Sequence, residues 1–190
     1  MEIPYTPMEA LSRIRLEHPE IRIESKADSI VMKIIDRFLK IVSLGKVNSF
    51  MSHYTTTLGY TIYLPSEFGS FSPTERVAIY LHEAVHVRQA KRYTRLLFSL
   101  MYLFLPIPIG FAWARIAFEW EAYSVNIRVM ADRYGIDFVK SGKFKNFIIE
   151  QFTGPSYIYM CLSRKYIEKL YTKLIYELEQ EEYMKMSVNS

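Results

Sequence analysis

The chain has 190 residues, of which 50% are hydrophobic and 15% aromatic, and this composition excludes an intrinsically disordered protein. The length is enough for one domain with a hydrophobic core. A formal net charge of +4 is too small to indicate nucleic acid as a partner, and the single cysteine, Cys161, cannot form an internal disulfide. The acidic Glu2 and the lack of an apolar run behind it predict no signal peptide and a cytoplasmic protein.

The first 45 residues are expected to form the N-terminal helices. Thr6-Pro7-Met8-Glu9 is a capping box with proline at the first helical position, so a helix should begin there and end before Pro19. A second helix is expected over residues 28–44, before Gly45. Its apolar residues recur at helical spacing and indicate a packed scaffold helix: Ile30, Ile34, Phe38 and Ile41.

A small antiparallel sheet is predicted from alternating polar and apolar residues. Residues 20–24 alternate and are expected to form a short strand. Thr, Tyr and Ile alternate over residues 55–64, which indicates two strands or one bent strand ending at Pro65. This last strand should lie near the next helix, where it either only covers that helix or pairs its edge with an extended peptide.

A long helix is predicted over residues 73–93, because Ser72-Pro73-Thr74-Glu75 repeats the capping signature. This helix contains His82-Glu83-Ala84-Val85-His86, a His-Glu-x-x-His motif. Histidines four residues apart share one helix face, about 6 Å apart along the axis, so both imidazoles can reach one metal ion. Glu83 falls at the edge of that face, where it can take a proton from a water molecule on the metal.

The residues around the motif are apolar, which favours a metal site. Residues 77–87 are apolar around nearly the whole helix, as in a buried helix. Two buried imidazoles and a buried carboxylate are costly without partners, and one cation satisfies all three. The alternative is a pair of core histidines bonded to carbonyl groups, with Glu83 facing solvent.

Residues 96–114 form a stretch without charged side chains. Its length would suffice for a membrane span, but Pro106, Pro108 and Gly110 predict a turn between two short arms. We expect an apolar hairpin that is buried or covered by a protein partner, in preference to a flap that meets a membrane surface.

A third metal ligand is expected on a second long helix, over residues 111–134. A catalytic zinc ion needs three protein ligands and one open position. A carboxylate from this helix is a better candidate than His18, which precedes a proline at a helix end, or His53, which lies on the sheet segment.

Two carboxylates of that helix compete for the role of third ligand. Glu119 and Glu121 lie about 160° apart around a helix, so only one of them can face the metal, and the spacing alone does not choose between them. Glu119 could instead form an ion pair with Arg115, four residues earlier on the same face.

His-Glu-x-x-His followed on a second helix by Glu119-x-x-Ala122 resembles the gluzincin branch of zinc metallopeptidases, and most of all the HtpX-type peptidases. The resemblance covers about residues 59–126 and implies a zincin-like fold, a zinc cofactor and Glu119 as the third ligand. Where that family has an aspartate, this chain has Tyr123, which could bond a ligand or donate to the oxyanion. The pattern, including Gln89, is also similar to small zincin-like proteins of bacteria and phages.

Together these patterns predict one mostly helical α+β domain over residues 1–190, with a zincin-like metallopeptidase fold, a small antiparallel sheet and a long active-site helix. N-terminal helices occupy residues 1–45, a metal-site core residues 46–135, and C-terminal helices residues 136–190. The last helix should pack through a face that carries Ile167, Leu170, Tyr171, Leu174 and Leu178.

The expected function is that of a zinc metalloendopeptidase that hydrolyses a peptide or protein substrate. His82, His86 and Glu119 would bind Zn²⁺. Glu83 would be the general base and Tyr123 the donor to the oxyanion. One alternative is a catalytically silent protein with a zinc clamp in a larger assembly such as a phage particle, and another is a membrane-surface-associated protein that uses residues 96–114.

Overall fold

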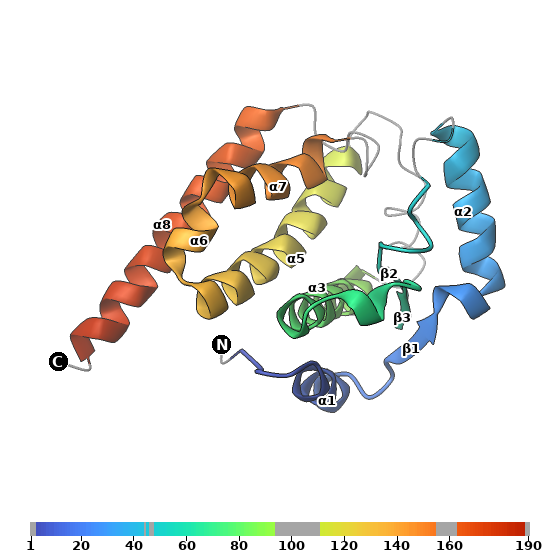
Figure 1. Ribbon diagram of the computed structural model, residues 1–190, viewed down its shortest axis with the longest axis horizontal. Helices are drawn as coiled ribbons and strands as arrows, with labels where there is room; N and C mark the ends of the chain where they lie inside the picture. The colour runs from blue at the N-terminus through green and yellow to red at the C-terminus, as the bar shows by residue number, and fades with distance from the viewer. Residues whose placement is uncertain (1–2, 44, 46–47, 94–110, 155–162, 189–190) are drawn as a thin grey trace.

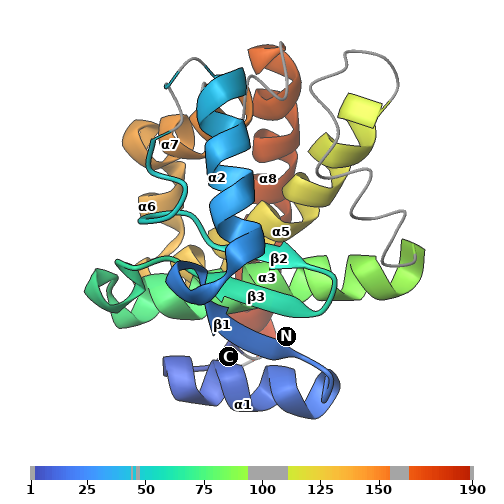
Figure 2. The ribbon, with the colours of Figure 1, turned by 90° about the vertical axis from the view of Figure 1, so that its right-hand side faces the viewer.

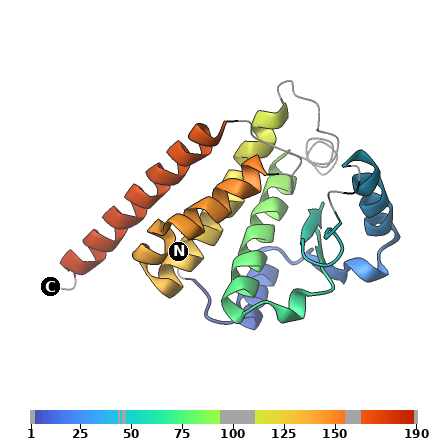
Figure 3. The same cartoon turned by 45° about the horizontal axis from the view of Figure 1, so that its top comes forward.

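The computed structural model describes residues 3–43, 45, 48–93, 111–154 and 163–188, and these form helices and one three-stranded sheet (Figure 1). The predicted class, α+β and mostly α, is confirmed. Helix α3 (Pro73–Tyr93) runs through the middle of the molecule. The sheet, α1 (Pro7–Glu17) and α2 (Ile30–Val42) lie on one side of it, and helices α5 to α8 lie on the other (Figure 3).

The sheet is mixed, so the expected antiparallel sheet is only partly correct. Strands β2 (Thr56–Leu58) and β3 (Thr61–Leu64) pair antiparallel, joined by a turn in which Gly59 has φ 62°. Strand β1 (Arg22–Ser25) pairs parallel with β3, because the chain crosses from one to the other through α2. The order β1-β3-β2 makes β3 the central strand, so the edge next to α3 belongs to β2, rather than to the last strand as expected.

Helix α1 packs on α3, and both helices begin at the predicted caps. Thr6 Oγ1 accepts a hydrogen bond from the Glu9 backbone N–H at 3.1 Å. The core cluster that joins α1, α3 and the sheet includes Ala10, Ile14, Ile62, Val77, Ala84 and Val87.

Helix α2 does not pack through the residues that predicted it. Its buried residues are Met32 and Asp36, whereas Ile30, Ile34, Phe38 and Ile41 are exposed. The expectation of a packed helix face at those four positions is therefore wrong. Apolar residues occupy more than half of the circumference of α2, so periodicity alone could not tell which part would meet the core.

The other half of the molecule is a helical layer. Helices α5 (Phe111–Tyr134), α6 (Ile136–Lys140), α7 (Gly142–Thr153) and α8 (Arg164–Val188) enclose a second core cluster. The predicted face of α8 lines this cluster through Ile167, Tyr171 and Leu174, with Leu170 and Leu178 packed against it, and is confirmed.

The predicted apolar hairpin cannot be compared with the fold. Residues 96–110 lie outside the described residues, and residues 111–114 begin α5. Within the described chain, none of the helices combines the length and the hydropathy that a membrane crossing requires.

Candidate metal centre

The cap of α3 fixes where the helix that carries the His-Glu-x-x-His motif begins. Ser72 Oγ accepts from the Glu75 backbone N–H at 3.2 Å, and Glu75 Oε2 accepts from the Ser72 backbone N–H at 2.7 Å. This reciprocal capping box is the one that the sequence predicts. The helix that starts there places His82 and His86 on the face towards α5, and both histidines are buried.

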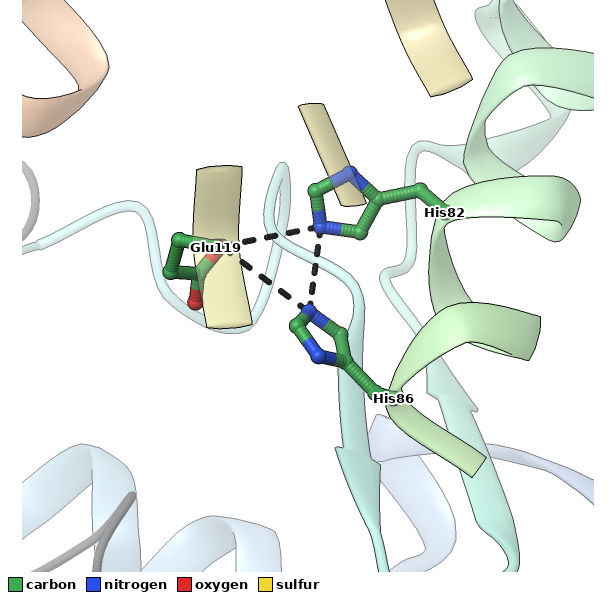
Figure 4. Close-up of side chains that lie close together, drawn as sticks. All are labelled: His82, His86 and Glu119. Atoms are coloured by element: carbon green, nitrogen blue, oxygen red, sulfur yellow. Dashed lines mark hydrogen bonds and ion pairs between the residues drawn. The ribbon is translucent and has the colours of Figure 1, made fainter. Parts of the chain in front are cut away.

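His82, His86 and Glu119 meet where α3 and α5 pack together (Figure 4). The two Nε2 atoms lie 3.2 Å apart, and Glu119 Oε2 is 3.7 Å from Nε2 of His82 and 3.8 Å from Nε2 of His86. One ligand atom from each residue lies within 4.8 Å of the others. This buried group could bind a metal ion, and it is composed of the three predicted ligands.

The tautomer of His86 follows from the contacts of Gln89. The Gln89 Nε2 donates to the Phe118 carbonyl at 3.1 Å and to Glu121 Oε2 at 2.9 Å, and both oxygens can only accept. Gln89 Oε1 must therefore face Nδ1 of His86, 2.9 Å away, and this nitrogen must be the donor. In a neutral His86 the free lone pair is then on Nε2, which points at the other two ligands.

His82 is held in an environment that favours its protonated form when no cation is bound. Burial by itself lowers the pKa of His82, but hydrogen bonding to Glu119, the charges of Glu83 and Glu119, and hydrogen bonding to Asn126 together outweigh it, so the pKa is raised. His82 Nδ1 and Asn126 Oδ1 are both buried, and neither atom makes a hydrogen bond of good geometry within the described residues. A cation would take the place of the proton that His82 otherwise gains.

Glu83 follows His82 in the chain and its charge acts on His82, but Glu83 is not one of the three candidate ligands. It is buried, and its Oε2 accepts a hydrogen bond from Thr57 Oγ1 of the edge strand β2 at 2.7 Å. The alternative in which Glu83 faces solvent is therefore wrong, because the sheet covers this side of α3. Thr57 leaves Oε1 as the second acceptor atom of this carboxylate.

A buried lysine lies close enough to Glu83 for the two charges to interact. Lys26 is 0% exposed, and its Nζ donates to the Phe50 carbonyl at 2.9 Å and sits 3.4 Å from the centroid of the Phe50 ring. Burial lowers the pKa of Lys26 to about 7, while the charges of Glu83 and Asp36 act to raise it. A partly neutral lysine is therefore part of the electrostatic surroundings of Glu83.

The competing ligand candidates lie elsewhere. Glu121 binds Gln89 instead of facing the histidines, so the choice that the spacing left open falls to Glu119. His18 is 2.9 Å from Lys91 Nζ, and burial followed by the Lys91 charge lowers its pKa. His53 is exposed and pairs with the carboxylate of a neighbouring glutamate.

Tyr123 borders the group of ligands. Its ring packs edge-on against the His82 ring, with centroids 4.9 Å apart. Its hydroxyl donates to Gln151 Oε1 of α7 at 3.5 Å, the long limit of a hydrogen bond. The packing orients the imidazole of His82, whereas the role of Tyr123 as a donor to an oxyanion stays a prediction.

Three residues at the site escaped the sequence analysis: Thr57, Lys26 and Asn126. Asn126 follows Glu119 by seven residues and so shares its helix face, which is a signal that could have been used. Nothing in a run of three threonines singles out Thr57, because its partner is 26 residues away. Lys26 is equally hidden, since buried lysines are rare and have no local signature.

Comparisons of the chain with protein-family models, with curated proteins and with solved structures found no match in any of the three. The chemistry of the site has to be inferred from its geometry.

Proposed function

We propose that the protein is a zinc-dependent metallopeptidase of the zincin type, in which His82, His86 and Glu119 bind the metal ion and Glu83 is the general base. One observation carries the proposal: a buried carboxylate, oriented by Thr57, stands next to three converging ligand atoms but is not one of them. A purely structural metal site has no use for such a group. The zincin-like fold belongs to the same proposal, and a buried motif helix beside a small sheet supports it.

The donor set favours zinc. Two imidazole nitrogens and one carboxylate oxygen suit a transition-metal cation, whereas calcium and magnesium prefer oxygen ligands throughout. Three protein ligands are also the usual number in a catalytic zinc site, where a fourth position is left for water or substrate.

A bound Zn²⁺ would supply a Lewis acid that acidifies water and polarises a peptide carbonyl. Glu83 accepts the proton of the attacking water through Oε1, while Thr57 holds Oε2 and stops the carboxylate from rotating. As the water oxygen bonds to the carbonyl carbon and the C–N bond breaks, Glu83 passes this proton to the leaving nitrogen. Tyr123 can donate to the carbonyl oxygen only after its hydroxyl leaves Gln151.

The sheet suggests how a peptide substrate would bind. The edge strand β2 carries Thr57, so the same strand that orients Glu83 borders the site. An extended peptide could add to this edge through backbone hydrogen bonds, which would place its carbonyl groups beside Glu83.

A second candidate function is a zinc clamp that stabilises the fold in a larger assembly. Burial of the ligands favours it: the side chains of His82, His86 and Glu119 are 9%, 2% and 0% exposed. A metal ion that water and substrate cannot reach would be structural, because a catalytic zinc ion keeps one position open to them.

Two measurements on the full chain separate these functions. We expect about one zinc per chain by metal analysis, and casein cleavage that a chelator abolishes and zinc restores. Glu83→Gln should retain zinc and lose activity by about 100- to 10,000-fold, the usual contribution of a general base. The matched control is Glu182→Gln on the exposed side of α8, which should change neither.

Equal cleavage by Glu83→Gln and the unaltered chain would rule out the hydrolytic mechanism. Zinc without any cleavage would favour the clamp.

A further inference from the structure

Helix α2 carries a strip of large apolar side chains on its solvent side. The exposed fractions are 74% for Ile30, 61% for Ile34, 55% for Phe38 and 74% for Ile41, and Val31 beside them is 46% exposed. These residues recur at intervals of three or four, so they form one continuous strip along the helix axis. We call these five residues the α2 strip.

The opposite side of the helix holds it in place. Met32 and Phe50 are the buried residues of one hydrophobic cluster, and Ile35 and Leu39 pack against it. Asp36 is buried on this side too, and its Oδ2 accepts from Lys40 Nζ at 2.7 Å. Helix α2 therefore already packs on the core through this inward face. The α2 strip is a second apolar face, which the fold leaves exposed.

Cations flank the strip along one side. Lys33, Arg37 and Lys40 are exposed and fall within an arc of about 60° next to it, at 100° per residue. The acidic residue of α2, Asp36, is only 8% exposed and already bonded to Lys40. The outer surface of the helix is therefore apolar and bordered by positive charges. A surface that binds it should be apolar and bordered by negative charges.

The position of α2 fits a flat partner. The helix stands at the rim of the molecule, beyond the sheet and on the side away from α5–α8 (Figures 1, 2 and 3). A second copy of α2 would bring the same three cations and no exposed carboxylate to meet them. Charge complementarity thus favours an anionic lipid surface over self-association.

We infer that α2 is an interfacial helix that docks the protein on an anionic bilayer. The α2 strip lies at the boundary between headgroups and acyl chains, and Lys33 and Arg37 contact the anionic headgroups. This inference does not depend on the proposed peptidase activity.

Flotation of the full chain with phosphatidylcholine vesicles, prepared with and without phosphatidylserine, tests the inference. The protein should float with the vesicles that contain phosphatidylserine, and added salt should weaken binding because the headgroup charges are screened. The double substitution Ile34→Glu and Phe38→Glu should abolish flotation. Leu16→Glu is the matched control, because Leu16 is 83% exposed on α1, and it should leave flotation unchanged.

The cations are tested one at a time. Lys33→Ala and Arg37→Ala should each weaken binding about fivefold, the order expected for one cation near an anionic surface. Lys173→Ala on α8, with a side chain that is 76% exposed, is the control and should bind like the unaltered chain. All substitutions are at exposed positions, and circular dichroism melts check that the variants fold.

Three results would overturn the inference. The first is no flotation with phosphatidylserine vesicles, and the second is flotation that survives Ile34→Glu and Phe38→Glu. The third is a concentration-dependent dimer, seen by light scattering and lost in that double variant, without lipid binding, which would assign the α2 strip to a second copy of the chain.

Discussion

Polar side chains are buried where α3 meets α5, whereas large apolar side chains are exposed along α2. His86 is 2% and Glu119 0% exposed, but Ile30 and Ile41 are each 74% exposed. Buried charges cost free energy unless something pairs with them, and exposed apolar strips cost free energy unless something covers them. Each region therefore indicates a different missing partner: a cation for the first and, as we infer, an anionic lipid surface for the second.

Lys26 shows that burial of a charged side chain is not by itself evidence for a ligand. Its amino group is as deeply buried as Glu119, yet the Phe50 carbonyl and ring satisfy it within the chain. What distinguishes the candidate metal centre is that possible ligand atoms of three residues converge. The following predictions compare these regions, from the largest expected effect to the smallest.

Metal binding should have the largest effect on stability. Zinc at about a thousand times its dissociation constant should stabilise the metal-free protein by about 4 kcal/mol, because only the folded state brings the ligands together. Glu119→Ala should abolish this gain, and Glu121→Ala should keep most of it. Calorimetric melts with and without zinc measure both, and an undiminished gain in Glu119→Ala would contradict the assigned ligand.

Loss of the contact that orients His86 should have the next largest effect. Gln89→Leu has about the same size but cannot accept from Nδ1, so zinc affinity should fall about 10- to 100-fold. Glu121→Gln should have a smaller effect, because its amide oxygen can still accept from Gln89. Competition with a chromophoric chelator measures the affinities, and an unchanged affinity in Gln89→Leu would show that the hydrogen bond is incidental.

Lys26 should make stability depend on pH. Its pKa is about 7 in the folded chain and near its ordinary, higher value when unfolded, so the unfolded chain binds more protons between these values. The free energy of unfolding should rise by about 2 kcal/mol from about pH 7 to about pH 9 through this group, and be lowest below pH 7.

Lys26→Met should lack this rise, since it keeps the apolar volume without the amine. Urea unfolding at both pH values tests it. A difference between the two proteins that does not change with pH would contradict the lowered pKa.

Removal of an exposed apolar side chain of α2 should have the smallest effect. Phe38→Ser should change the free energy of unfolding by less than about 0.5 kcal/mol, because the ring is 55% exposed and the two residues have similar helix propensities. Met32→Ala, on the buried face of the same helix, should cost about 2–5 kcal/mol. Equal losses in urea unfolding would mean that the α2 strip contributes to the fold.

Local rules of the chain accounted for much of the fold. The capping boxes at Thr6 and Ser72 marked where α1 and α3 begin. The spacing of His82 and His86 placed both on one face, because a helix repeats every 3.6 residues whatever surrounds it. All of these depend on neighbours within one or two helical turns, which is why the sequence by itself determined them.

Contacts between distant segments were decided only by the tertiary structure. The side of α5 that packs against α3 brings Glu119, not Glu121, to the histidines. The parallel pairing of β1, the hydrogen bond from Thr57 to Glu83 and the choice of which apolar side of α2 is buried all depend on partners far away in the chain. Contacts between residues far apart in the chain produce no periodic pattern in the sequence. Side chains of the same type can therefore be buried at one position and exposed at another.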